Sequence, residues 1–118
     1  MTWLVRDGDV LATADEATSV PDRLRGLWHR PAPMGALILR PPIVLHTMGL
    51  PYTVDVAFCD DGTDGRMAVT ETVRMPPFRV ARPRRHTKMI VVAADGAFER
   101  WRLVVGDELE ISGRANGG

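Results

Sequence analysis

Cysteine is almost absent from this sequence, because Cys59 stands alone among 118 residues. A single cysteine excludes a disulfide within the chain, so we expect a protein of a reducing compartment. Aromatic residues make up only 6% of the chain, and no apolar run approaches the roughly 20 residues that a membrane-spanning helix needs. The N-terminus shows no basic segment followed by a long apolar one. A cytoplasmic location without membrane contact is therefore predicted.

Paired metal ligands and the common catalytic motifs are also missing. The histidines His29, His46 and His86 and the thiol of Cys59 stand at none of the paired spacings that zinc sites show. The chain has no Gly-x-Ser-x-Gly nucleophile motif and no glycine-rich phosphate loop. We therefore predict no metal, no cofactor and no catalytic residue, and a binding role is favoured over an enzyme.

Net charge is zero, yet positive charge is concentrated in one segment. From Arg74 to Lys88 the chain holds six basic residues and no acid. Such a segment can bind phosphate, nucleic acid or an acidic protein face, or its arginines can be solvated or paired with acids of the first half of the chain. The zero net charge and the single aromatic residue of the segment, Phe78, argue against nucleic acid. The candidate binding residues here are Arg79, Arg82, Arg84 and Arg85.

The clearest strand pattern lies in residues 46–60. Apolar and other residues alternate there with the two-residue period of a strand, and the apolar face carries Val54, Val56 and Phe58. We expect the segment that ends at His46 to form a hairpin with this strand across a tight turn. Asp55 lies on the opposite face, which we expect to be covered as well. A buried carboxylate needs backbone donors or an arginine, and Arg79 and Arg23 are the arginines expected to serve.

Short strands separated by turn signals make up most of the remaining chain. Asp7-Gly8 predicts a hairpin, Glu71 predicts a bulge, an edge position or an arginine partner, and residues 88–94 are apolar enough for a central strand. Short helices are expected near residues 20–28 and 97–102. The predicted fold is mainly β, a compact antiparallel β-sandwich or small barrel with one or two short α-helices. One domain is expected over residues 1–111, followed by a flexible tail at 112–118.

Several short motifs occur together in an order that is typical of one family. They are Arg23-Leu24-Arg25-Gly26-Leu27, His46-Thr47-Met48-Gly49, Val54-Asp55-Val56-Ala57-Phe58, Pro77-Phe78-Arg79-Val80 and Gly106-Asp107 with Leu109. On these residues the chain resembles, over residues 20–111, the domain of unknown function 192 family in its bacterial, actinobacterial form. The resemblance implies a small, mainly β single domain, and no established activity comes with it. The expected structural residues are Arg23, Gly26, Asp55, Gly106 and Asp107.

Three hypotheses for function follow. We favour a binding or accessory domain with a protein partner. The first alternative is a ligand-binding barrel or enzyme that uses a polar cluster of His46, Asp55 and Arg79. The second alternative is a basic adaptor that binds an anionic partner through Arg74 to Lys88. The cluster would require a shared pocket, whereas the adaptor would require an exposed arginine face.

Overall fold

The computed structural model describes residues 2–17, 35–41, 45–47, 52–82 and 84–113. In chain order its elements are β1 (Thr2–Arg6), β2 (Asp9–Ala17), β3 (Ala36–Leu39), β4 (Leu45–His46), β5 (Val54–Asp61), β6 (Met67–Met75), β7 (Val80–Ala81), β8 (Met89–Ala94), α2 (Ala97–Trp101) and β9 (Glu108–Gly113). Strands thus dominate the described chain, as predicted. No helix in this described part is long and apolar enough to cross a membrane.

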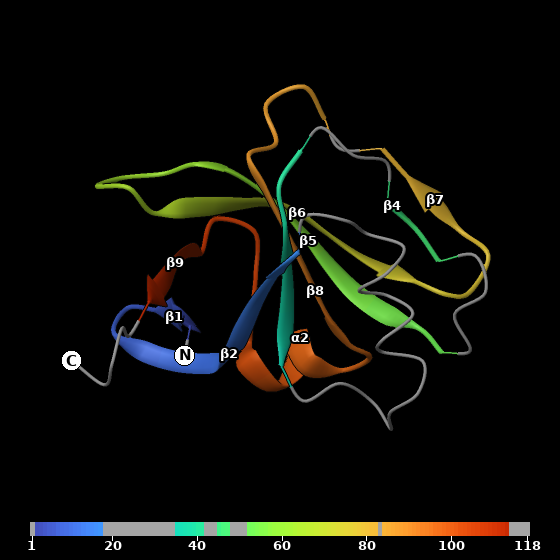
Figure 1. The fold of residues 1–118 in the computed structure, drawn as a ribbon, viewed down its shortest axis with the longest axis horizontal. Coiled ribbons are helices and arrows are strands. Elements are labelled where there is room, and N and C mark those ends of the chain that lie inside the picture. Colours follow the sequence, from blue (N-terminus) through green and yellow to red (C-terminus); the bar gives the residue numbers. More distant parts are fainter. Residues whose placement is uncertain (1, 18–34, 42–44, 48–51, 83, 114–118) are drawn as a thin grey trace.

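The main sheet closes into a barrel in the order β1-β2-β3-β8-β5-β6-β9, with β9 pairing back onto β1 (Figure 1). This confirms the small-barrel alternative of the predicted fold. The barrel pairs are antiparallel except for β2 and β3, which run parallel. Parallel neighbours need a long crossover connection. The connection here falls on residues 18–35, almost all of which lie outside the described residues, together with the predicted helix at 20–28, Arg23 and Gly26.

One predicted turn and one predicted strand are confirmed, but one predicted pairing is wrong. The β1–β2 turn has positive φ at Asp7 (52°) and Gly8 (82°), the combination that a tight two-residue hairpin turn requires. The central strand β5 forms as expected. Its partners are β6 and β8, however, whereas the segment ending at His46 forms β4 and pairs with β7 in a separate two-stranded sheet. Two residues of β4 offer far fewer ladder hydrogen bonds than the long strands β6 and β8.

Of the three alternatives predicted at Glu71, the bulge is present in β6. Phe58 of β5 pairs with Glu71, and Cys59 pairs with Val69, so Thr70 is the extra residue. The Thr70 hydroxyl donates a hydrogen bond to the Phe58 carbonyl at 3.0 Å. The bulge changes the register between the two ends of this long hairpin, and Glu71 is half-buried beside it.

Apolar side chains fill two layers, one on each face of the β3-β8-β5-β6 sheet. The inner layer, within the barrel, includes Leu4, Ile38, Ala57, Cys59, Val69, Met89, Val91 and Leu109. The outer layer includes Leu37, Leu39, Val54, Val56, Phe58, Met75, Ile90 and Val92. All six residues of β8 are buried, which confirms the prediction of a central strand. Each large aliphatic side chain buried in this way contributes about 1.5–3 kcal/mol to folding.

The C-terminal third closes one end of the barrel. Helix α2, the predicted helix after β8, packs Ala97 and Phe98 against the inner layer and lies below the barrel in Figure 1. The last strand, β9, continues to Gly113. This strand therefore runs two residues past the predicted boundary at 111, and the rest of the predicted tail lies outside the described residues.

Candidate binding sites

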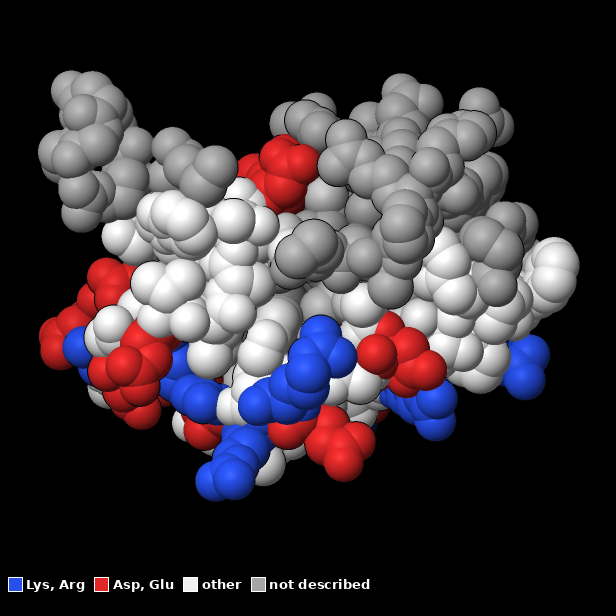
Figure 2. All heavy atoms as spheres, turned by 90° about the horizontal axis from the view of Figure 1, so that it is seen from below, with Lys and Arg blue, Asp and Glu red and all other residues white. Residues whose placement is uncertain are grey.

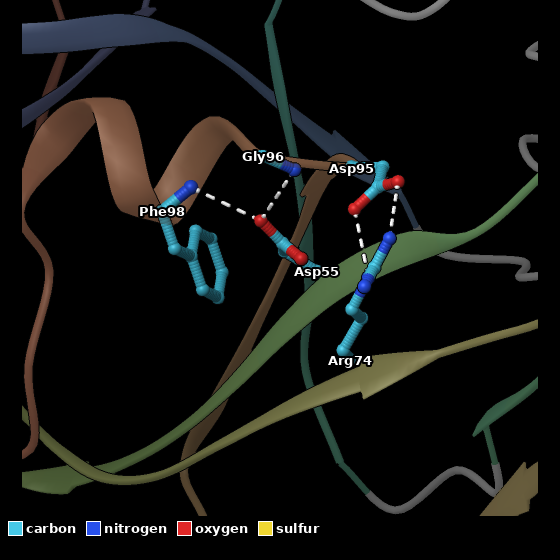
Figure 3. Close-up of polar contacts among 5 residues, drawn as sticks. All are labelled: Asp55, Arg74, Asp95, Gly96 and Phe98. Atoms are coloured by element: carbon cyan, nitrogen blue, oxygen red, sulfur yellow. Dashed lines mark hydrogen bonds and ion pairs between the residues drawn. The ribbon is translucent and has the colours of Figure 1, made fainter.

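Asp55 anchors α2 to the barrel. Its side chain is 8% exposed and lies on the face of β5 opposite Val54 and Val56. One carboxylate oxygen, Oδ2, accepts hydrogen bonds from the backbone N–H groups of Gly96 and Phe98, each at 3.1 Å (Figure 3). The N-cap residue of α2 is Gly96, which has no side chain to cap the helix. Asp55 therefore caps this helix from a distant strand, satisfying N–H groups that would otherwise lack acceptors.

Asp55 was predicted to bind either backbone donors or an arginine, and the structure shows backbone donors. Arg79 is not the partner, since no ion pair joins it to Asp55 within the described chain, and Arg23 falls outside that part. The sequence could not show the donors, because they come from a turn that follows another strand.

Arg74 and Asp95 form a bidentate ion pair next to this anchor. Arg74 of β6 is directly opposite Asp55 of β5 in the sheet register, so both side chains leave the same face. Arg74 Nε and Nη2 donate to the two oxygens of Asp95 at 2.9 and 2.8 Å (Figure 3). The hydrogen bond and the charge of Asp95, and then the charge of Asp55, raise the pKa of Arg74 above its ordinary value. Arg74 was predicted only as the first residue of the basic segment, and its pairing with Asp95 was not predicted, because it depends on strand register.

These residues border a hollow of about 300 Å³ at the α2 end of the barrel. We call it the α2 hollow, and its described lining consists of Asp55, Thr72, Val73, Arg74, Asp95, Gly96, Phe98 and Glu99. Arg79 is not part of this lining, and the side chain of His46 lies outside what the structure describes. The predicted cluster of His46, Asp55 and Arg79 is therefore not assembled by the described residues, and only Asp55 borders the hollow.

The face that carries α2 has mixed charge. Among the described residues visible from below, basic and acidic side chains are intermixed, and neither sign forms an extended patch of its own (Figure 2). Such a surface lacks the extended positive field that binds a nucleic-acid backbone.

The second candidate site is the predicted basic segment, of which we call residues 76–85 the basic arm. Thr47, which is 1% exposed, holds the start of this arm. Its hydroxyl donates to the Pro76 carbonyl at 2.7 Å and accepts the Arg79 N–H at 2.8 Å. Its backbone N–H donates to the Arg79 carbonyl at 2.8 Å, and its carbonyl accepts the Phe78 N–H at 3.2 Å. This turn is therefore held by a single buried threonine, whose role has no local mark in the sequence.

The fixed turn displays apolar side chains to solvent. Phe78 has a φ of 64°, in the left-handed region that bulky residues rarely adopt, and its side chain is 65% exposed. Val80, two residues later, is 55% exposed. Large apolar side chains at such exposure contribute little to the core.

The four predicted arginines belong to the same arm and are all exposed. Arg84 contacts Glu71 at 3.5 Å. Arg79, Arg82 and Arg85 form no ion pair with any acid in the described part of the chain. Of the two alternatives for these arginines, pairing with acids of the first half is not seen among the described residues.

Gly106 and Asp107, two of the residues predicted to be structural, lie in the turn before β9 and contact neighbouring strands. Gly106 has a φ of 100° and donates its N–H to the Val69 carbonyl at 2.8 Å. The Asp107 carboxylate accepts hydrogen bonds from Arg6 and from the Val104 N–H, each at 3.0 Å. Together these contacts join the turn before β9 to β1 and β6.

The remaining candidate for reactivity is Cys59, which is fully buried in the inner layer. Burial raises the pKa of its thiol to about 12, so the reactive thiolate is suppressed at neutral pH. No group of three or more His, Cys, Asp or Glu side chains within the described ranges is arranged to hold a metal ion.

Comparison with known proteins identifies the fold and no family. No family model and no curated protein matches the chain. A crystal structure of a proposed transcription regulator from Sinorhizobium meliloti 1021 is similar, with a TM-score of 0.68 and 18% identity over 93% of this chain and 91% of that one. A protein of unknown function from Novosphingobium aromaticivorans DSM 12444 has a TM-score of 0.66 and 15% identity over 92% of this chain and 82% of that one. At such identities the likeness shows a shared fold, and the resemblance to the domain of unknown function 192 family stays a prediction.

Proposed function

We propose that this barrel is a binding domain rather than an enzyme, and that its basic arm binds an acidic surface of a protein partner. The observation that carries the proposal is the exposed side chain of Phe78 at a positive φ. A bulky residue in this region costs of the order of 1–3 kcal/mol and persists where the surrounding structure imposes it. The four hydrogen bonds between Thr47 and residues 76–79 supply that constraint. Backbone strain of this kind clusters at functional sites.

The chemistry of the arm suits a protein interface. Aromatic residues and arginine are the types most enriched where proteins meet, and a ring surrounded by polar groups is typical of an energetic centre. Phe78 and Val80 supply apolar area, and Arg79, Arg82 and Arg85 supply charge that no acid of the described chain neutralises. A partner with carboxylates around an apolar depression would complement both features.

Nucleic acid is a weaker candidate for the same surface. The fold shared with a proposed transcription regulator favours it, but that likeness concerns the fold alone. Sequence-tolerant binding to single strands relies on several stacked aromatic rings, whereas the arm offers Phe78 alone. The mixed charge of the α2 face does not extend the positive surface.

The test measures the effect of the Phe78 ring on partner binding separately from the effect of the arginine charges and from any change in stability. Native lysate is incubated, at low and at high salt, with four immobilised proteins. They are the parent, Phe78→Gly, an Arg82→Ser/Arg85→Ser double variant and the control Val104→Ser. Val104 is 59% exposed on the turn after α2, so it matches Phe78 as an exposed apolar residue outside the arm. We expect one set of bound proteins to be retained by the parent and by the control, to be lost from both arm variants, and to be released by high salt.

The stability of Phe78→Gly gives the second readout. Glycine adopts a positive φ without strain, so its thermal melt should stay within about 1 kcal/mol of the parent in unfolding free energy, or rise. Loss of binding at unchanged stability identifies the ring as functional. Equal capture by parent and Phe78→Gly would contradict the proposal. A different result would be retention of the protein on a heparin or oligonucleotide column in a way that depends on Arg82 and Arg85 but not on Phe78. That result would replace the proposed protein partner with an anionic polymer.

A further inference from the structure

The α2 hollow is independent of the basic arm and has its own chemistry. We propose that it binds a small organic cation, a molecule that carries an ammonium or guanidinium group on a short aliphatic chain. Three features support this assignment: the balance of charge in the hollow, an oxygen of Asp55 that lacks a partner, and the apolar lining beside it.

The charge balance of the hollow is negative. Its lining contains three carboxylates, Asp55, Asp95 and Glu99, and one cationic group, Arg74. The guanidinium of Arg100 lies close to Gly96 at the edge of this lining, so the acids exceed the bases by one. Arg74 uses Nε and Nη2 to bind both oxygens of Asp95, which neutralises that acid. The charges of Asp55 and Glu99 are left without a comparable ion pair among the described residues. An anion would meet net repulsion here, whereas a cation would be attracted.

Asp55 presents one carboxylate oxygen to the hollow. Its Oδ2 takes both hydrogen bonds from α2, and its Oδ1 forms none within the described part of the chain. Figure 3 shows this second oxygen turned away from α2 and toward the side of Arg74, which lines the hollow. The side chain is only 8% exposed, so the oxygen is held rigidly. A buried carboxylate with a free oxygen is a strong acceptor for a charged N–H donor.

The rest of the lining suits the carbon chain of such a ligand. Phe98 and Val73 contribute apolar surface, and the Phe98 ring is fixed against Trp101 with a centroid distance of 5.5 Å. A volume of about 300 Å³ lies at the lower end of the range for small-molecule sites, which fits a molecule of a few heavy atoms. A metal ion fits less well, because no three suitable ligands converge within the described ranges.

The test is an amide NMR titration of the full chain with 1,4-diaminobutane at low salt. Matched titrations use 1,4-butanediol, which has the same length without charge, succinate, which has the opposite charge, and magnesium chloride. We expect saturable shifts for the diamine at the amides of Thr72, Gly96 and Glu99, and no saturable shifts there for the other three compounds. Saturable shifts with butanediol or succinate would show that the hollow does not select a cation and would overturn the proposal. Saturable shifts with magnesium would show that it binds a metal ion and not an organic cation.

Two acidic variants separate the hollow from general surface charge. Glu99→Gln should weaken diamine binding at least fivefold, because it removes a charge that lines the hollow. Glu110→Gln, on the exposed part of β9, is the matched control and should leave the affinity unchanged. Equal effects of the two variants would mean attraction by net charge alone and would overturn the site. The arm variant Phe78→Gly should bind the diamine as the parent does, so the outcome does not depend on the proposed protein partner.

Discussion

Replacing Asp55 tests whether this barrel depends on a cap provided by a distant strand. In Asp55→Ala the N–H groups of Gly96 and Phe98 lose their shared acceptor. An orphaned donor costs about 1–3 kcal/mol when buried and less when water reaches it. The Phe98 bond is buried, whereas that of Gly96 is partly buried and borders the hollow. We therefore expect a loss of about 2–4 kcal/mol in the free energy of unfolding.

Asp55→Asn should fall between this variant and the parent. The amide oxygen still accepts from α2, but the charge that strengthens both hydrogen bonds is lost, and the amide NH₂ faces Arg74. We expect a loss of about 1–2 kcal/mol, since hydrogen bonds to charged groups exceed neutral ones by about that amount. Asp95→Ala removes only the exposed ion pair with Arg74 and should cost less than about 1 kcal/mol.

The assay is urea unfolding of these variants together with Arg79→Met, followed by amide hydrogen exchange. A stability order of parent, Asp95→Ala, Asp55→Asn and Asp55→Ala is expected, with reduced protection at the Gly96 and Phe98 amides in the last variant. Arg79→Met should add independently to Asp55→Asn, because no contact couples them among the described residues. Full stability in Asp55→Ala would refute the cap, and strong coupling to Arg79 would restore the arginine as its partner.

Three further predictions follow from individual contacts. Cys59 should resist Ellman's reagent at pH 8 in the folded protein and react after unfolding, and rapid labelling of the native state would contradict its burial. Because the folded pKa of about 12 exceeds the ordinary value of 9.0, the contribution of this thiol to stability is complete below pH 9.0 and should decline as pH rises toward 12. Hydrogen bonds from the Thr63 hydroxyl and N–H lower the pKa of Glu108, and this stabilisation is present above the ordinary value of 4.5 and lost as pH falls through the lowered one. Thr63→Ala should raise that pKa in an NMR titration, and an unchanged midpoint would show that the hydroxyl is irrelevant. Thr47→Val removes the buried hydroxyl that holds the arm and should cost about 1–3 kcal/mol in a thermal melt, whereas an unchanged melt would mean that the arm is held by other contacts.

Local features of this protein were determined by the sequence itself. Asp7-Gly8 predicted the β1–β2 turn, since these residues tolerate the positive φ that it needs. Alternation predicted the faces of β5, and the continuous apolar run predicted β8 as a strand buried on both sides. Glu71, an acid on an apolar face, indicated an irregularity in β6, and the bulge was one of the three alternatives that it left open. Each of these inferences needs only neighbouring residues, because turn geometry and side-chain direction are properties of short segments.

Contacts between distant segments were decided by the tertiary structure alone. β4 pairs with β7 instead of β5, because β5 has the longer strands β6 and β8 on its two edges. Asp55 could be recognised as a carboxylate that requires donors, but its donors come from a turn that α2 brings to the barrel end. The Arg74–Asp95 pair, the α2 hollow and the Thr47 contacts arise in the same way. Such contacts depend on the order and register of strands, and the side chains that meet there carry no local mark of their partners.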